Sequence, residues 1–326
     1  MTPEPMQDQR VFDLLSGVSR TFALSIVVLR GTLASDVATA YLLCRLLDTV
    51  EDDANLPATE RRHVLSGLAD GIGNPAQEAE ALELLAGLEG RITATPVELE
   101  LLAEAPALFA RIKRMDAQRG QVLRRWAEEM ARGMAEFVSD TPGASIHTLQ
   151  DLARYCHYVA GTVGGMLTGL FALTGPGVTA QRQRRLETHM EAFGRGLQMV
   201  NIIKDCGKDW SMGRCFLPGE LAGNEAGFRG AHPHLLGELV KQAEVDLDDA
   251  VRYIRNLPRR MWRARLFCVY PLVFARKTLR ILAGNQARTG EQGPKISRKD
   301  VKRAMLFSAP AAFSNLWLRL VCRRQT

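Results

Sequence analysis

Apolar residues recur at the three- and four-residue spacing of amphipathic helices along most of the chain. This spacing predicts helices over residues 36–50, 80–92, 96–115, 120–138, 186–205 and 234–257. The one strand-like run, residues 267–274, is short and is interrupted by Pro271. Breaks rich in Pro and Gly separate the helices, and none is long enough to be an interdomain linker. We therefore expect an all-α protein with a single domain over residues 1–326.

A central segment, residues 155–181, contains no Asp, Glu, Lys or Arg. Its length suits a transmembrane helix, and Gly161, Gly165 and Gly169 have the spacing of small residues found where membrane helices pack together. The central helix of a soluble bundle has the same composition, because its glycines let a neighbour or a ligand approach the backbone. Threonines and Pro176 make the segment less apolar and shorter, so we favour the buried helix.

The overall composition is that of a globular protein. Hydrophobic residues make up 46% of the chain and charged residues 24%, without a long Ser, Gln or Pro tract, so we expect folded structure throughout. The six cysteines form no CxxC pair and no metal-finger spacing, which is typical of core thiols in a reducing compartment. The first residues carry acids and prolines where a secretory signal has a basic start, so a cytoplasmic location is expected.

The net charge is +6, and basic residues gather among Leu, Phe and Trp in the C-terminal segment 295–326. Two interpretations are open for this basic and apolar segment. It lies on an anionic membrane surface as a peripheral contact, or it is a solvated basic helix that packs on the body of the protein. No nucleic-acid recognition motif accompanies the charge, so no nucleic-acid partner is expected. The sequence leaves the oligomeric state open.

Carboxylates are crowded near the predicted ends of two helices. Asp48, Glu51 and Asp52 have the spacing of one helix face, and Asp205 and Asp209 repeat the four-residue spacing before two glycines. The C-terminal end of a helix is the unfavourable end for anions, and each charge there costs about 0.3 to 1 kcal/mol. Like charges at this spacing also repel each other. The pattern therefore needs a counter-charge.

Divalent cations are a suitable counter-charge. Carboxylates bind Mg²⁺, which keeps several waters and shares its other positions with substrate phosphates, so a bound diphosphate becomes a good leaving group. Arg45, Lys204 and Arg214 stand beside the clusters as further anion ligands. A solvated helix end is the alternative for either cluster alone, and the repetition favours metal. A third acidic group, residues 246–249, has basic residues one turn away, and we interpret it as an ordinary exposed face.

Five blocks of sequence resemble the squalene and phytoene synthase family and occur in the order seen there. They are SRTFALSI (19–26), YLLCRLLDTVEDD (41–53), GMAEF (133–137), YCHYVAGTVG (155–164) and LQMVNIIKDCGKDWSMGRCFLP (197–218). The resemblance is strong over residues 19–218 and weak beyond them. It implies a single-domain terpene-synthase (isoprenoid synthase) helical bundle with a central cavity, and a head-to-head condensation of two prenyl diphosphates.

The resemblance also implies roles for individual residues. The predicted Mg²⁺ ligands, on opposite walls of the cavity, are Asp48, Glu51, Asp52, Asp205 and Asp209. The predicted diphosphate contacts are Ser19, Arg20, Phe22, Arg45, Gln198, Asn201, Lys204 and Arg214. Tyr155 matches the tyrosine that assists proton loss, with Tyr41 nearby as a second phenol. The chain departs from the family at Lys204 and Lys208, where Arg and Glu are usual, and Lys208 removes one possible metal ligand.

The product depends on whether a reduction takes place. Formation of squalene needs a hydride from NADPH, whereas dehydrosqualene and phytoene form without reductant. YCHYVAG resembles the squalene-forming branch, and so does the basic segment 294–302, which implies contacts of Lys295, Arg298 and Lys299 with the cofactor phosphates. We therefore expect a prenyltransferase that uses Mg²⁺ and NADPH to convert two molecules of farnesyl diphosphate to squalene. The alternatives are dehydrosqualene or phytoene formation without reductant, and a non-catalytic membrane-embedded helical protein.

Overall fold

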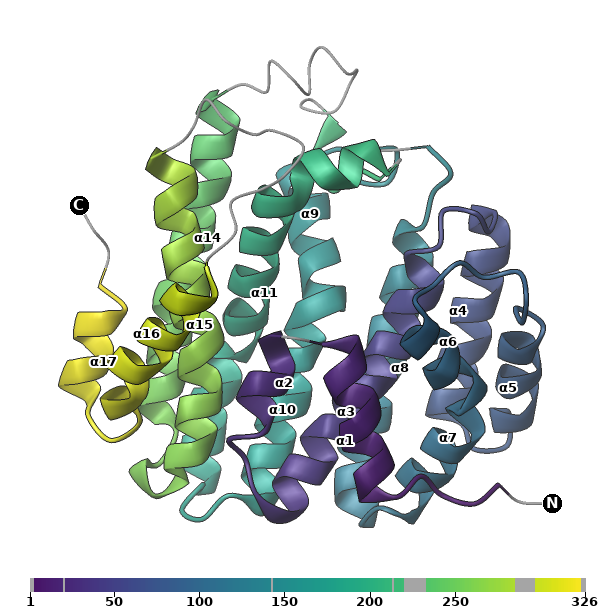
Figure 1. The fold of residues 1–326 in the computed structure, drawn as a ribbon, viewed down its shortest axis with the longest axis horizontal. Coiled ribbons are helices and arrows are strands. Elements are labelled where there is room, and N and C mark those ends of the chain that lie inside the picture. The colour runs from purple at the N-terminus through teal and green to yellow at the C-terminus, as the bar shows by residue number, and fades with distance from the viewer. Residues whose placement is uncertain are drawn as a thin grey trace. The chain divides into compact units, whose positions relative to one another are not determined.

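The computed structural model describes residues 3–19, 21–141, 143–212, 214–219, 233–284 and 297–323. Every regular element in these ranges is helical, so the predicted all-α class is confirmed (Figure 1). The chain divides into two compact units, and we describe each by itself. Unit 1 is Met1–Asp140 with Gly165–Thr174, and unit 2 is Thr141–Gly164 with Gly175–Thr326. The single domain over residues 1–326 stays a prediction.

Unit 1 is built around α3, α4 and α8, which contact one another. Its helices are α1 (Asp8–Val18), α2 (Thr21–Ile26), α3 (Gly31–Glu51), α4 (Ala58–Gly73), α5 (Glu78–Ala86), α6 (Pro96–Ala103), α7 (Ala105–Arg114), α8 (Ala117–Phe137) and most of α10 (Thr162–Thr174). Leu46, Leu68 and Met134, one from each central helix, are completely buried. The core of unit 1 therefore holds the apolar face of α3, the helix that carries the first acidic cluster.

Unit 2 is built around α11, a helix of 32 residues and about 48 Å. Its elements are α9 (Leu149–Cys156), η1 (His157–Gly161), α11 (Ala180–Ser211), α14 (Pro233–Asn256), η2 (Arg259–Met261), α15 (Trp262–Gly284), α16 (Arg298–Ser308), η3 (Ala309–Ala312) and α17 (Asn315–Val321). α11 runs beside α14 and also contacts η1 (Figure 1). A Cβ atom added at Gly194 of α11 would lie 1.9 Å from the Ala160 carbonyl oxygen, so only glycine permits this approach to η1.

Side-chain acceptors fix the starts of several helices. Asp116 accepts hydrogen bonds from the first backbone N–H groups of α8 at 3.2 Å, and Thr148 accepts one from α9 at 3.1 Å. Ser297 and Ser314 do the same for α16 and α17, at 3.1 and 3.2 Å. The first N–H groups of a helix have no partner within it, so these side chains determine where each helix begins.

The uncharged central segment continues α9 and η1 into α10 (Thr162–Thr174). In the described part of the chain, Leu149–Thr174 is the one helix long and apolar enough to cross a membrane, a test that core helices of soluble proteins also pass. Within unit 1, an added Cβ at Gly165 would lie 2.4 Å from the Trp126 ring, and one at Gly169 would lie 2.7 Å from Val122. These glycines therefore allow α10 to pack closely on α8, as a buried helix requires.

The strand-like run 267–274 lies within α15, with Pro271 inside the helix. Pro271 lacks an N–H and leaves one helical hydrogen bond unmade, which the surrounding packing tolerates. The six cysteines are free thiols, and Cys156, Cys206, Cys268 and Cys322 are buried. Burial raises the pKa of the Cys156 thiol to about 12, so it stays protonated as a core residue.

Candidate active site

The first acidic cluster lies at the end of α3, as the sequence predicts. α3 ends at Glu51, and the Asp52 N–H donates to the Asp48 carbonyl at 2.8 Å. Asp52 is exposed, Glu51 is almost completely buried, and 36% of the Asp48 side chain is exposed. Desolvation, followed by the charge of Asp52, raises the pKa of Asp48 to about 7. The Asp48 carboxylate is therefore not fully compensated by Arg45, and together with Asp52 on the same helix face it offers a donor pair that fits a divalent cation.

Arg45 lies between Asp48 and a second carboxylate that the sequence analysis missed, Glu98. Arg45 Nη1 is 3.8 Å from Asp48 Oδ2, whereas its Nε donates to Glu98 Oε1 at 3.0 Å. Glu98 is buried and also accepts hydrogen bonds from the Thr95 N–H and hydroxyl, at 2.8 and 2.7 Å. Burial acts to raise the pKa of Glu98, but these hydrogen bonds outweigh it and lower that pKa. Glu98 therefore holds the guanidinium of Arg45 in place beside the cluster.

Tyr41 is one turn before Arg45 and contacts the segment that precedes α3. The rings of Tyr41 and Phe22 have centroids 5.8 Å apart. Ser19 accepts a hydrogen bond from the Phe22 N–H at 3.1 Å, and it also hydrogen-bonds with the Tyr41 side chain. Burial raises the pKa of Tyr41, against the opposing effects of Ser19 and Arg45, so the phenol is neutral near pH 7. Arg20 lies outside the described residues.

The second acidic cluster lies in the last two turns of α11. Asp205 pairs with Lys204 at 3.0 Å, and Asp209 pairs with Arg214 at 3.2 Å. Lys204 also donates to the Asn201 side chain at 3.1 Å. Because each carboxylate already has a cationic partner, a metal ion fits this pair less readily than the first.

Two details around the second cluster were not foreseen. The sequence suggested that Gly207 breaks the helix, but α11 continues through it to Ser211. Lys208 lies exposed in the last turn of α11, where a positive charge is favoured by the helix dipole. Gln198, predicted to face the diphosphates, is half-buried two turns before Asp205. Lys208, which departs from the family pattern, thus has a local electrostatic reason for its positive charge.

Tyr155 is buried at the end of α9, and its ring stacks on Phe216 with centroids 5.0 Å apart. Phe216 is two residues after Arg214, so unit 2 brings Tyr155 to the loop that follows the second cluster. The next five residues form η1, a π-helical turn. Such turns accommodate an extra residue and are frequent at functional sites. Apolar periodicity did not predict this turn.

A network of partly buried charged side chains joins η1, α11 and α14 in unit 2. His157 lies 3.5 Å from Glu191, Glu191 lies 3.2 Å from Arg195, and Arg195 makes bonds of 2.6 and 2.8 Å with Asp246. Asp246 is only 1% exposed. The interpretation of residues 246–249 as an exposed face is therefore wrong for Asp246, which is buried because Arg195 of α11 neutralises it.

The predicted cofactor residues are described only in part. Lys299 is exposed in the first turn of α16, while Lys295 and the side chain of Arg298 lie outside the described residues. In the ranges that the structure covers, no group of three or more His, Cys, Asp or Glu side chains forms a metal site. A metal ion at either cluster would therefore bind two carboxylates and complete its shell with water and substrate phosphate. The assigned site residues stay predictions.

Comparisons with known proteins extend the resemblance to most of the chain. The sequence pattern of the squalene/phytoene synthase family matches residues 15–300. Squalene synthase of Eremothecium gossypii is 30% identical over 292 residues, covering 85% of this chain and 63% of its own length. Squalene synthase of Yarrowia lipolytica is 27% identical over 316 residues, covering 93% of this chain and 65% of its own length. This chain thus spans less than two thirds of the length of these relatives.

Solved structures of squalene and dehydrosqualene synthases have folds similar to that of this chain. A structure of TcSQS with the ligand BPH1237 aligns with a TM-score of 0.76 and 26% identity, covering 98% of this chain and 92% of that one. A dehydrosqualene synthase aligns with a TM-score of 0.58 and 21% identity, which shows a shared fold. The predicted isoprenoid synthase helical fold is confirmed. Because the family match also includes both acidic clusters, the chain belongs to the squalene/phytoene synthase family.

Proposed function

We propose that the protein is a squalene synthase, a prenyltransferase that joins two molecules of farnesyl diphosphate head to head and reduces the resulting presqualene diphosphate to squalene with NADPH. The observation that carries this proposal is Asp48 at the end of α3, whose carboxylate is incompletely compensated by Arg45 and lies near Asp52. Such a pair suits a metal-bound diphosphate. The relatives named squalene synthase support squalene as the product.

Asp48 and Asp52 are the proposed principal ligands of Mg²⁺, with buried Glu51 as a third candidate. Asp205 and Asp209 form the second pair, where binding requires Lys204 and Arg214 to move toward the phosphates. When bound, Mg²⁺ would neutralise charge on the leaving diphosphate. The chain itself supplies the acidic oxygens and the cations that orient this group.

The remaining residues bind and orient the substrate. Arg45, held by Glu98, donates hydrogen bonds to a diphosphate, and Ser19 and Phe22 cover it from the segment before α3. Tyr155 assists the proton loss that closes the cyclopropane ring of presqualene diphosphate: its phenol oxygen accepts that proton while its own O–H proton passes to the released diphosphate. Its ring is fixed by Phe216, which keeps the phenol oxygen in one position. Because a phenol is a weak base, the released diphosphate shares this role.

The cell compartment and the membrane contact also belong to this proposal. The six free cysteines suit a reducing, cytoplasmic environment. Squalene and both prenyl chains are insoluble in water, so an enzyme at the membrane surface takes up substrate and releases product without exposing them to water. We infer a cytoplasmic protein, organised as one domain, that makes peripheral contact with a membrane.

Incubation of the purified protein with farnesyl diphosphate or geranylgeranyl diphosphate, with and without NADPH, tests this function. We expect Mg²⁺-dependent release of diphosphate from farnesyl diphosphate, squalene only when NADPH is present, and presqualene diphosphate in its absence. A hydrocarbon product formed equally well without NADPH refutes the reductive step and favours the dehydrosqualene or phytoene alternative. No diphosphate release from a protein that requires detergent for solubility favours the non-catalytic membrane protein.

A further inference from the structure

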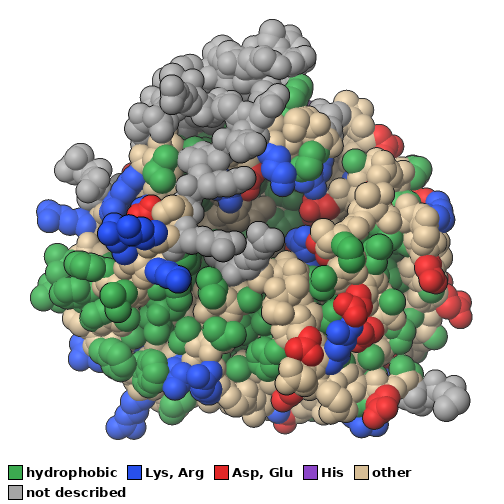
Figure 2. All heavy atoms as spheres, in the orientation of Figure 1, with side chains coloured by type: hydrophobic (Ala, Val, Ile, Leu, Met, Phe, Trp, Pro, Cys, Tyr) green, Lys and Arg blue, Asp and Glu red, His purple; other side chains and the backbone are tan. Residues whose placement is uncertain are grey.

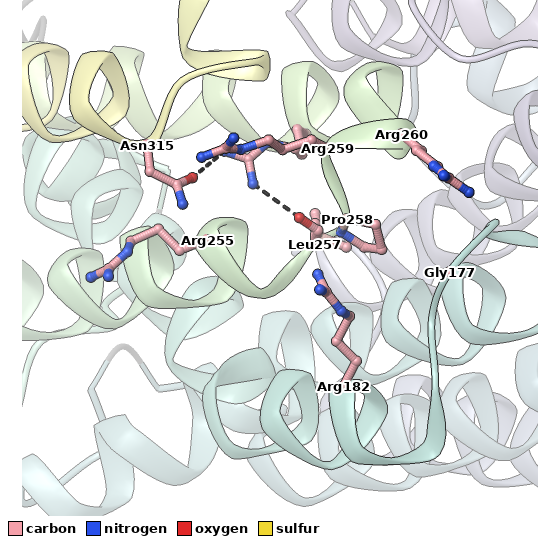
Figure 3. Close-up of a pocket in the computed structure, with 9 residues that line it drawn as sticks. Gly177, Arg182, Arg255, Leu257, Pro258, Arg259, Arg260 and Asn315 are labelled. Atoms are coloured by element: carbon pink, nitrogen blue, oxygen red, sulfur yellow. Dashed lines mark hydrogen bonds between the residues drawn. The ribbon is translucent and has the colours of Figure 1, made fainter.

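An arginine-rich pocket lies in unit 2, outside both acidic clusters. It has a volume of about 420 Å³, and a second pocket of about 310 Å³ shares Arg255 and Asn315 with it. Figure 3 shows the residues that line the larger pocket, which come from the start of α11, the end of α14, η2 and the start of α17. The arginines that line the two pockets are Arg182, Arg252, Arg255, Arg259, Arg260 and Arg265. The described residues that line the pockets include no Asp or Glu.

Arg252 at the edge of these pockets pairs with Asp249 at 2.5 Å, but the positive charge around Arg265 is poorly compensated. Arg265 is completely buried and donates to the carbonyls of residues 254, 257, 311 and 312 and to the Asn315 side chain at 2.7 Å, all of them uncharged. Burial, together with the charges of Arg259 and Arg182, lowers the pKa of Arg265 to about 10. Among the described residues, no carboxylate pairs with Arg255, Arg259 or Arg265. A buried, unpaired cation is costly, so an anion in the pocket would lower the electrostatic free energy.

This pocket is far from the second cluster. Arg182 is in the first turn of α11 and Asp205 is near its end, 23 residues later and therefore about 35 Å away along the helix. The positive end of the α11 dipole also points toward the pocket, which adds to its attraction for anions. The pocket is therefore separate from the proposed diphosphate ligands of α11.

A hydrophobic surface adjoins the pocket. Leu306 and Phe307 of α16, Phe313, and Leu316 and Leu320 of α17 are between 55 and 79% exposed. The two helices hold together through the Trp317 indole N–H, which donates to the Phe307 carbonyl at 2.7 Å. Figure 2 shows this green surface on the left, over α16 and α17, with blue basic side chains around it. Asn315 lines the pocket while its chain neighbour Leu316 belongs to the hydrophobic surface, so the two features are contiguous.

The charge of this surface suits an anionic bilayer. Residues 301–323 contain no Asp or Glu, and Lys302, Arg303, Arg319 and Arg323 are exposed. Exposed apolar side chains that lie singly need no explanation, but a contiguous set ringed by basic residues is typical of a membrane-surface helix. A soluble protein partner would not need a cavity that places six arginines beside apolar side chains. An acidic phospholipid supplies both a phosphate and acyl chains.

We propose that the α16–α17 surface docks on an anionic phospholipid bilayer, and that the arginine pocket beside it binds a lipid headgroup phosphate. In this arrangement Leu316, Leu320 and Phe313 enter the interfacial layer, and the exposed Arg255 and Arg259 contact the phosphate. Arg265, whose N–H groups all donate to protein oxygens, adds its positive charge from behind them. The inference rests on the proposed membrane location, but it needs neither catalysis nor farnesyl diphosphate. It can therefore fail while the proposed reaction stands.

Flotation of the full chain with vesicles tests the docking. We expect binding to vesicles that contain a third phosphatidylglycerol, little binding to pure phosphatidylcholine, and a steep loss with added salt. Arg255→Gln/Arg259→Gln should weaken binding about fivefold for each arginine removed. The matched control Lys113→Gln/Arg114→Gln removes the same charge from exposed positions of α7 in unit 1 and should bind as wild type.

A separate variant tests the contribution of the apolar side chains to vesicle binding. Leu316→Ser changes a side chain that is 69% exposed, so the fold should persist, and vesicle binding should fall several-fold. Leu99→Ser, at an exposed position of α6, is the control. Equal binding of the arginine variant and its control overturns the headgroup site. The membrane docking is overturned if the protein binds inorganic phosphate but not vesicles. It is also overturned if the wild-type protein self-associates instead of binding vesicles, and Leu316→Ser abolishes that self-association. Squalene formation from detergent-dispersed substrate should be unchanged in all four variants.

Discussion

Asp48→Asn should stabilise the metal-free protein at neutral and alkaline pH, although it should remove activity. The carboxylate of Asp48 is desolvated and lies near Asp52, so the folded state disfavours its ionised form. Below about pH 3.8 the group is protonated in both the folded and unfolded states, and the penalty is absent. The penalty grows as the pH rises from 3.8 to about 7, and it is complete above that value. Asparagine, which carries no charge, avoids it at every pH.

The size of this effect follows from the pKa of Asp48. A rise from 3.8 to about 7 corresponds to about 4 kcal/mol in the free energy of unfolding at full strength. Because 36% of the Asp48 side chain is exposed, solvent screens the interaction, and we expect about 1 to 2 kcal/mol. The ion pair of Asp48 with Arg45 is lost in the variant, but at 3.8 Å it contributes less than this.

Urea unfolding in EDTA measures the effect at about pH 4.5 and about pH 8.5. Asp48→Asn should exceed wild type in the free energy of unfolding at the higher pH, and most of that difference should vanish at the lower pH. Glu89→Gln, which neutralises an exposed carboxylate of unit 1, should show no such difference. Mg²⁺ with inorganic diphosphate should stabilise wild type more than Asp48→Asn. A variant that is no more stable than wild type at about pH 8.5 would refute the reasoning.

Three further predictions concern single side chains. Asp48→Ala and Asp52→Ala should nearly abolish diphosphate release from farnesyl diphosphate while leaving the circular dichroism spectrum unchanged, and retained turnover would remove the metal assignment. Glu98→Gln should lower the free energy of unfolding by about 1 to 3 kcal/mol in urea, because it breaks a largely buried pair with an arginine; an unchanged midpoint would contradict this. Gly194→Ala should lower the melting temperature by several degrees, since its Cβ would lie 1.9 Å from a carbonyl oxygen of η1. Gly237→Ala, which meets open space on α14, should raise it slightly, and equal effects of the two substitutions would disprove the packing argument.

Much of the local structure could be predicted from the sequence. Helices are present in all the ranges where apolar periodicity predicts them, although the range 96–115 is divided into α6 and α7 and the central helix α4 was not predicted. Asp48 lies in the last turn of α3, close to the predicted helix end at residue 50. The strand-like run 267–274 lies within α15, which agrees with the expected all-α class, because its proline argues against a central strand. The resemblance to the family also pointed to Tyr155, which the structure holds against Phe216. Periodicity and helix-end electrostatics are local, so one sequence is enough to show them.

The partners of charged side chains depended on tertiary structure. Nothing near Glu98 in sequence indicates that it holds Arg45, 53 positions earlier, and nothing near Asp246 indicates that Arg195 keeps it buried. Arg265 likewise takes its hydrogen bonds from two segments far apart along the chain. The period of a helix determines which face a residue occupies, but the neutralising group comes from whichever helix packs against that face. The sequence by itself therefore determined the helices and the acidic helix ends, whereas only the packing of helices decided which charges are paired, buried or left to attract a ligand.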